Sequence, residues 1–530
     1  MKFGTFSNKR NLVSALALSV AAFAPATGGA GEVTLKSADG TVNLVGEFVA
    51  FSDNNYVIRT GLGDLRISAT RVRCEGADCP DIGGTAEADV KISGSDAVGE
   101  GVMPLLLSGY AAFLGAEATQ TATGTRGQFV TEMVGEEGFG DPMGAYLVSS
   151  TSSNDAFRTL LDNTTQIGMS DRRISPGEAR ALRDAGAGNM IDPSQENIIA
   201  VDSLVVIRHP DNPVDTLSME DLRGIYSGQI TNWAELGGND APIQVLDWPA
   251  DSGTRGVFEE QLFGDTPPPL RASAIEVTDN NEMAALVNQN ENAIGFVGYA
   301  FQRGAKPITL INECGLSMVP DAFSARTEEY ALQRFLYLYN RAELDDQSRD
   351  FVEYAISDAA DEVIAKAGFI DLGIDRRAQP LDGDRAKQLL NPNVDDFEGG
   401  VMRAMLSDMV EYDRLSTTFR FRTGSQRLDP RGQLNLERLA HYLESEPSGT
   451  KILFVGFTDD VGAFESNREL SVDRAAQVMS ELQNYAGDRL GDIDMQVTGY
   501  GEIAPAACNS TENQRRINRR VEVWIQNPNS

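Results

Sequence analysis

The chain has 530 residues, with 45 Lys or Arg and 78 Asp or Glu, so its formal net charge at pH 7 is −33. Such a chain is not expected to bind nucleic acid or an anionic membrane surface, because both require a clustered basic surface. Its 41% apolar content can fill several hydrophobic cores. Its length predicts about three to four domains. With 2 histidines and 4 cysteines, no His/Cys-rich metal cluster can form, and neither a metal nor a cofactor is expected.

Residues 1–30 have the composition of a secretory signal peptide. Lys2, Lys9 and Arg10 form a basic start, an apolar run follows over 12–24, and small residues at 24–30 supply cleavage sites. The apolar run is too short for an ordinary membrane-spanning helix, although a retained membrane anchor is the alternative. No later apolar run reaches the length of a span, so we expect export to the periplasm of a Gram-negative type envelope.

Residues 31–84 are predicted to form a small β-rich module. Alternating apolar and polar residues, separated by Gly and Asp-Gly, favour four or five short strands. Cys74 and Cys79 lie close in sequence at the end of this stretch, and an exported pair of this kind is expected to form a disulfide. Whether Cys314 and Cys508 also pair stays open. A docking role is the favoured interpretation of the module.

Residues 85–375 mix strand and helix patterns, as α/β domains do, and their number suits two lobes. Strands are expected near 90–92, 204–207, 243–246 and 293–297, and helices near 102–115, 154–162, 218–226, 255–263, 281–289, 326–339 and 346–366. The Pro- and Gly-containing stretch 376–400 is predicted to be a linker. Residues 401–530 are predicted to form a compact α/β unit, with strands near 418–421, 451–457, 494–499 and 519–525.

Three segments of the middle region place small hydroxyl residues where a strand gives way to a helix. These segments are Ser95 with Asp96, Ser170 with Asp171, and Ser252-Gly253-Thr254 followed by Arg255. A helix N-terminus offers free N–H groups and a positive dipole end, and hydroxyl groups add further donors. A single segment of this kind is more often a simple helix cap. The three together favour an anion site.

Residues 85–375 resemble phosphate-type periplasmic substrate-binding proteins, the receptors of phosphate ABC importers. The segments 222–233 (LRGIYSGQITNW), 252–254 (SGT) and 292–299 (NAIGFVGY) carry the resemblance. It implies a two-lobed periplasmic-binding-protein fold with an oxyanion held between the lobes. It also implies phosphate ligands at Ser252, Gly253, Thr254, Ser95 with Asp96, and Ser170 with Asp171. A carboxylate such as Asp171 can accept a proton from hydrogenphosphate, whereas sulfate has none to donate and is repelled.

The sequence departs from this family at one position. Its members usually carry an Arg four residues before the Ser of Ser-Gly-Thr, and Trp248 stands there in this chain. Arg255, Arg172 or Arg173 would then have to supply the positive charge.

Residues 401–530 resemble the OmpA-type peptidoglycan-binding domain, an α/β sandwich. The motifs lie at 457–462, 467–475, 499–502 and 518–522. The resemblance implies that Asp459 and Arg474 bind the ammonium and carboxylate groups of the diaminopimelate in the wall peptide, with Asn467 and Arg519 as further contacts. Phe457 replaces a His that is common in the family, a change expected to alter packing.

No enzyme is predicted. Ser252 lacks a Gly-x-Ser-x-Gly elbow, the two histidines lie in unrelated contexts, and no phosphate-binding Walker motif occurs. The chain is therefore predicted to be an α/β multi-domain protein that binds an oxyanion, most simply phosphate, in the periplasm. It would be anchored non-covalently to peptidoglycan near the cell wall or outer membrane and would serve an ABC importer or a sensor. The alternative is a structural envelope protein whose binding-protein fold has lost small-ligand binding, and a phosphatase is a distant third.

Overall fold

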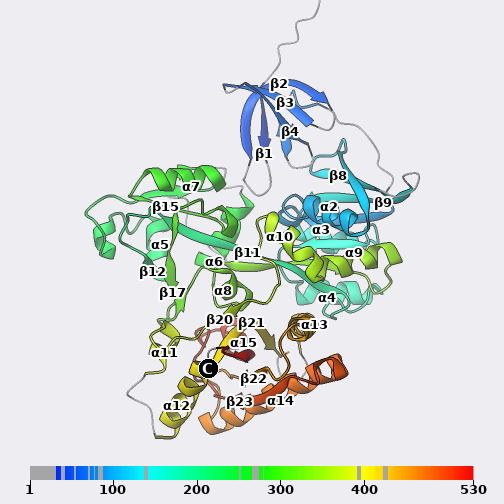
Figure 1. Cartoon of the computed structure of the whole chain (residues 1–530). Helices are drawn as coiled ribbons and strands as arrows, with labels where there is room; N and C mark the ends of the chain where they lie inside the picture. The colour runs from blue at the N-terminus through cyan, green and yellow to red at the C-terminus, as the bar shows by residue number, and fades with distance from the viewer. Residues whose placement is uncertain are drawn as a thin grey trace, which may run out of the picture.

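A computed structural model describes residues 32–36, 42–52, 55–61, 63–69, 72–76, 78–80, 88–135, 141–249, 252–264, 274–277, 280–390, 396–421 and 428–528. The expected signal peptide lies outside these residues. A small β-sheet, two α/β lobes and a C-terminal α/β domain follow one another along the chain (Figure 1). None of the helices in these ranges has the length and apolar character of a membrane span. The same ranges hold no group of three or more His, Cys, Asp or Glu side chains suited to a metal ion.

The N-terminal sheet has five antiparallel strands in the order β4-β3-β2-β1-β5. They are β1 (Glu32–Lys36), β2 (Asn43–Ser52), β3 (Asn55–Thr60), β4 (Gly63–Ser68) and β5 (Arg73–Glu75). Alternate residues of β1 and β3, such as Leu35 and Ile58, are buried on one face. Cys74 and Cys79 form a disulfide at the end of the sheet, with an S–S distance of 2.05 Å. The predicted β module and its disulfide are therefore confirmed.

The two lobes share one 11-stranded sheet, in the order β14-β13-β15-β11-β19-β10-β6-β9-β8-β7 with β16 paired to β11. The first lobe contains β6 (Val90–Ser95), β7 (Ala116–Ala122), β8 (Gln128–Gly135), β9 (Pro142–Thr151) and β10 (Ile167–Ser170). Its helices are α1 (Asp96–Gly99), α2 (Met103–Phe113), α3 (Ser153–Leu161), α4 (Pro176–Asp184), α9 (Asp346–Ile356) and α10 (Asp361–Lys366).

The second lobe is built around β13 (Gln244–Asp247), β14 (Ile275–Glu276), β15 (Ala293–Gly298) and β16 (Lys306–Pro307). A smaller sheet, β12-β17-β18, consists of Thr216–Ser218, Thr309–Ile311 and Ser317–Met318. The helices are α5 (Met219–Ser227), α6 (Gly253–Phe263) and α7 (Asn280–Gln289). Each lobe has its own large hydrophobic core, which confirms the predicted two-lobed fold class.

Two strands connect the lobes. The first half of β11 (Glu196–Arg208) pairs with β19 (Gln333–Asn340), and its second half pairs with β15 in the second lobe. Figure 1 shows β11 running between the two lobes. The helix predicted over 326–339 is wrong, since this stretch holds only the end of α8 (Ala322–Arg326) and then β19. Leu336 and Leu338 enter the first-lobe core, whereas Tyr337 and Tyr339 enter a second core on the other face. A strand buried on both faces is apolar throughout, so its pattern does not distinguish it from a buried helix.

The C-terminal domain has a five-stranded sheet in the order β20-β21-β24-β22-β23. Its strands are β20 (Arg376–Arg377), β21 (Tyr412–Arg420), β22 (Lys451–Gly456), β23 (Asp494–Gly499) and β24 (Arg520–Gln526). Its helices are α11 (Asp384–Gln388), α12 (Asp396–Glu411), α13 (Pro430–Glu444), α14 (Phe464–Ala486) and α15 (Glu512–Asn518). The predicted linker, 376–400, thus contains β20, α11 and the start of α12 in its described residues. β20 pairs with β21, and Ala386 of α11 joins a core of this domain.

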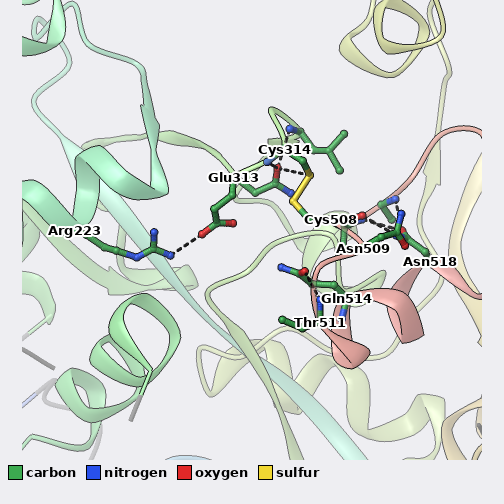
Figure 2. The surroundings of a disulfide bond; sticks show 12 residues. Arg223, Glu313, Cys314, Cys508, Asn509, Thr511, Gln514 and Asn518 are labelled. Atoms are coloured by element: carbon green, nitrogen blue, oxygen red, sulfur yellow. Dashed lines mark hydrogen bonds and ion pairs between the residues drawn. A yellow bond between two sulfur atoms is a disulfide. The ribbon is translucent and has the colours of Figure 1, made fainter. Parts of the chain in front are cut away.

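The C-terminal domain is fixed to both lobes. A disulfide joins Cys314, in the loop between β17 and β18, to Cys508, in the loop before α15 (Figure 2). The first lobe is held by Arg438 of α13, whose Nη1 lies 2.9 Å from Oδ2 of Asp361. The sequence had left the pairing of Cys314 and Cys508 open, because 194 residues separate them.

Candidate ligand-binding sites

A small cavity of about 60 Å³ lies between the two lobes. Three residues singled out in the sequence line it: Asp96, Asp171 and Thr254. Asp96 follows β6 and Asp171 follows β10, and these strands are parallel neighbours. The carboxyl ends of parallel strands meet at one sheet edge, where α/β proteins commonly bind ligands. Thr254 comes from the first turn of α6 on the opposite lobe.

Hydrogen-bond donors lie next to this cavity at two helix starts, beside the lining residues Asp96 and Thr254, although neither Ser95 nor Ser252 lines it. Ser95 precedes α1 and is 1% exposed, and its Oγ has no hydrogen-bond partner among the described residues. Ser252 caps α6, and its Oγ accepts the backbone N–H of Arg255 at 3.4 Å. The first N–H groups of α6, at Gly253 and Thr254, are therefore oriented as helix N-termini present them to anions.

Both carboxylate oxygens of Asp171 have partners within the protein. Oδ1 accepts a hydrogen bond from the hydroxyl of Ser153 at the start of α3. Oδ2 lies 2.5 Å from Nη1 of Arg334. These contacts fix the carboxylate at the edge of the cavity, where it can meet a ligand proton.

Arg334 is the functional candidate that the sequence analysis missed. It lies on β19, lines the cavity, and its Nε is 3.0 Å from Oδ2 of Asp202 as well as contacting Asp171. Burial alone would lower the pKa of Arg334, but the carboxylates of Asp202 and Asp171 outweigh it and raise that pKa. The guanidinium is therefore charged at all physiological pH values. The sequence signal for Arg334 was a single arginine beside an apolar run.

The arginines proposed from the sequence have other partners. Arg255 forms an ion pair with Glu259 at 2.7 Å, and its Nη1 donates to the backbone oxygen of Trp248. Arg172 pairs with Glu178 and Arg173 pairs with Glu196, each at 2.7 Å. None of the three lines the 60 Å³ cavity.

Two further residues of the predicted set have local structural roles. Ser170 is buried, and its hydroxyl donates to the backbone oxygen of Arg172 at 2.6 Å, closing the turn that presents Asp171. Trp248 is 1% exposed in the second-lobe core, where its Nε1 donates to the backbone oxygen of Phe296 at 3.1 Å. The indole at the usual arginine position therefore contributes to the core, and the positive charge at the cavity comes from another strand.

A second group of predicted residues converges in the C-terminal domain. Asp459 follows β22, and its Oδ2 lies 2.7 Å from Nη1 of Arg519 at the end of α15. Asn467 of α14 donates to the backbone oxygen of Asp459 at 3.3 Å and to Oε2 of Glu502 at 2.5 Å. Phe457 is fully buried beneath the guanidinium of Arg520, which lies 4.2 Å from the ring centre.

Arg474 of α14 lacks a carboxylate of its own in this group. Its Nη1 is buried and has no hydrogen-bond acceptor in the described part of the chain. Burial and the nearby charge of Arg519 lower the pKa of Arg474, and Asp459 opposes them only in part. Arg474 therefore has an incompletely balanced positive charge, whereas Asp459 is already paired with Arg519.

Comparisons with known proteins cover both parts. Residues 81–359 match the PBP superfamily domain, and residues 420–519 match the OmpA family. The phosphate-binding protein PstS of Bacillus subtilis (strain 168) is 26% identical over 227 residues, which cover 42% of this chain and 70% of that protein. PstS of Pseudomonas aeruginosa (strain PAO1) is 28% identical over 246 residues, covering 42% and 73%. An ABC-type phosphate transport receptor from Vibrio cholerae has 28% identity and a TM-score of 0.40, with 53% of this chain and 99% of that chain covered.

Proposed function

We propose that this chain, which belongs to the PBP superfamily and carries an OmpA family domain, is a periplasmic phosphate-binding protein held non-covalently on peptidoglycan. Its relatives in Bacillus subtilis and Pseudomonas aeruginosa are named as phosphate-binding proteins, which supports binding in preference to catalysis. The observation that carries the proposal is the meeting of Asp96, Asp171, Thr254 and Arg334 at one cavity between the lobes.

The charges of this cavity favour an oxyanion that keeps a proton over one that is fully ionised. Arg334 supplies one positive charge, and Asp96, Asp171 and Asp202 supply carboxylates. An anion without a proton is repelled by the carboxylates, whereas hydrogenphosphate can donate its proton to Asp171. The Ser95 hydroxyl and the N–H groups at the start of α6 donate to the remaining oxygens. The Arg334 guanidinium, which lines the cavity beside Asp171, also binds the ligand.

Titration calorimetry of the full-length exported protein with phosphate and with sulfate tests this proposal. Wild type should bind phosphate and discriminate against sulfate. Asp171→Asn removes the repulsion between this carboxylate and a fully ionised anion. It should therefore lower the ratio of phosphate affinity to sulfate affinity by a larger factor than it lowers phosphate affinity itself. Asp346→Asn, which changes a carboxylate that is 93% exposed, serves as the control. If Asp171→Asn leaves the ratio of phosphate affinity to sulfate affinity unchanged, the role proposed for Asp171 is wrong.

The peptidoglycan-binding part of the proposal rests on Asp459 and Arg474. Diaminopimelate ends in an ammonium and a carboxylate, and Asp459 and Arg474 provide the complementary charges. Asn467 and Arg519 hold Asp459 in place. We further propose that the captured phosphate is passed to an ABC importer or read by a sensor. Phosphate uptake by cells that lack the chain, with and without its re-expression, tests that step.

A structural envelope protein without a small ligand is the second candidate function. Trp248 favours it, because the position that usually carries the family's arginine is built into a hydrophobic core. Calorimetry separates the two functions. A wild-type protein that binds neither phosphate nor sulfate, yet sediments with peptidoglycan, would support the structural function.

A further inference from the structure

A second cavity, of about 250 Å³, lies where the second lobe meets the C-terminal domain. It is distinct from the cavity between the lobes and shares no lining residue with it. Four arginines line it, namely Arg377, Arg385, Arg414 and Arg520. The rest of its wall includes apolar side chains such as Leu316, Val319 and Met409. The cavity therefore combines cationic and apolar surface in a protein whose net charge is −33.

Three of these guanidiniums share one carboxylate. Glu522 of β24 has a fully buried side chain. One of its carboxylate oxygens lies 2.9 Å from Arg385 and 3.0 Å from Arg414, and the other lies 2.7 Å from Arg520. The indole N–H of Trp524 also donates to Glu522, at 2.9 Å. Glu522 is thus saturated with donors and cannot compensate any further positive charge.

The remaining carboxylates near the cavity leave one positive charge uncompensated. Glu329 pairs with Arg414 at 2.5 Å. Arg377 is balanced by Asp321 at 2.6 Å, and the exposed Asp384 lies near Lys387. Asp384 also lines the cavity, but its side chain is 64% exposed, so among the described residues the ion pairs of Arg385, Arg414 and Arg520 are with Glu329 and Glu522. An uncompensated charge in such a place is costly unless another group neutralises it.

Arg385 bears most of this imbalance. Its Nη1 is buried without a hydrogen-bond acceptor among the residues that the structure describes. Burial and the adjacent charges of Arg414 and Arg520 lower the pKa of Arg385 to about 10, against the opposing effect of Glu522. An anion beside Arg385 would restore neutrality and accept the unused N–H groups.

We propose that this cavity binds a small organic anion, with a carboxylate or phosphate group at the arginines and a short chain against the apolar wall. The volume corresponds to roughly eight water molecules at about 30 Å³ each, which excludes bulky ligands. Because residues of the second lobe and of the C-terminal domain both line the cavity, a bound anion stabilises their interface. This site goes beyond the phosphate site and does not depend on it.

The test uses three probes with the same four-carbon chain on the full-length exported protein: butyrate, butyl phosphate and the uncharged butanamide. Calorimetry and thermal unfolding should show binding of butyrate, of butyl phosphate or of both, and none of butanamide. The anion that binds distinguishes a carboxylate ligand from a phosphate ligand. Arg385→Gln should weaken that binding about tenfold or more, as expected when a charge-assisted hydrogen bond is lost.

Three variants test whether the probes bind in this cavity. Arg385→Gln leaves two arginines facing two carboxylates, so it should fold, and its unliganded melting temperature should equal or exceed that of wild type. Thr254→Val changes the cavity between the lobes and should leave probe binding unchanged, as should Arg489→Gln, a surface arginine paired with Glu444. Failure of both anions to bind overturns the proposal. So does binding that survives Arg385→Gln or disappears in Thr254→Val.

Discussion

At the residue scale, Arg334 is the one cationic side chain among the described residues that line the interlobe cavity. Arg334 reaches the cavity from a strand that crosses between the lobes, and two carboxylates hold its guanidinium. Trp248 meanwhile fills a core position. In the proposed phosphate site, Arg334 would therefore supply the positive charge that an arginine at position 248 does not supply in this chain.

Two matched variants test which arginine supplies the positive charge for phosphate binding. Arg334→Gln should weaken phosphate binding at least about tenfold, because a charge-assisted contact is lost and Asp171 and Asp202 remain as repelling charges. Arg255→Gln should change phosphate affinity by less than about threefold, because Arg255 is paired with Glu259 outside the cavity. Calorimetry on both variants checks this prediction. The reverse order of effects would assign the charge to Arg255.

Asp247 gives a pH-dependent prediction. Burial raises its pKa from 3.8 to about 6, although Arg255 and the N–H of Trp248 oppose the shift. The folded protein therefore binds more protons at this group than the unfolded chain, and its contribution to stability falls as pH rises from 3.8 to about 6. Asp247→Asn should thus stabilise the protein by about 1–3 kcal/mol at pH 7.5 and by much less near pH 4. Thermal unfolding of both proteins across this range measures the difference, and a gain that is independent of pH would contradict the prediction.

At the element scale, β19 and α11 show how neighbours determine structure. β19 lies between β11 and β10, is covered on both faces, and carries Arg334 at the end near the second lobe. α11 looks like part of a linker in sequence, yet it brings Arg385 onto the carboxylate of Glu522. Both elements gain their stability from packing against distant parts of the chain.

The prediction for peptidoglycan binding concerns Arg474 of helix α14 and its neighbour Asp459. Arg474→Ala in the full-length protein should abolish sedimentation with purified peptidoglycan, since one ligand charge loses its partner at a cost of about 2–5 kcal/mol. Asp459→Ala should act in the same direction, and it additionally frees Arg519. Arg489→Ala, in the same domain but paired with Glu444, should sediment like wild type. Full sedimentation of both site variants would refute the assignment.

At the scale of the whole molecule, ion pairs and a disulfide bond join the C-terminal domain to the rest of the chain. The side chain of Glu328 is 5% exposed and forms ion pairs with Arg420, Arg431 and Arg516 of the C-terminal domain. Burial alone would raise the pKa of Glu328, but these three guanidiniums lower it. The disulfide shown in Figure 2 adds a covalent constraint at the same interface.

The two disulfides should differ in their effect on stability. The one between Cys314 and Cys508 closes a loop with a sequence separation of 194, whereas the one between Cys74 and Cys79 closes one of 5. Loop entropy alone predicts losses of about 5 and about 2 kcal/mol, respectively, when each pair is replaced by serine. Denaturant unfolding of the two double variants compares them. An equal or smaller loss for the Cys314/Cys508 variant would show that the interface is already held by its ion pairs.

The sequence by itself determined the α/β class, the likeness of the two large parts to binding proteins and OmpA-type domains, and the short disulfide of the β module. These features depend on local periodicity, on contiguous motifs, or on two cysteines five residues apart. It also indicated Asp96, Asp171 and Thr254, which the tertiary structure brings to one cavity.

Only the tertiary structure decided that Arg334 faces this cavity, that 333–340 is a strand, and that Cys314 meets Cys508. The same holds for the excess charge around Arg385, because Glu522 lies far from it along the chain. The physical reason is common to all four. Each depends on contacts with residues that are distant in sequence, and local sequence patterns carry no record of which distant residues become neighbours.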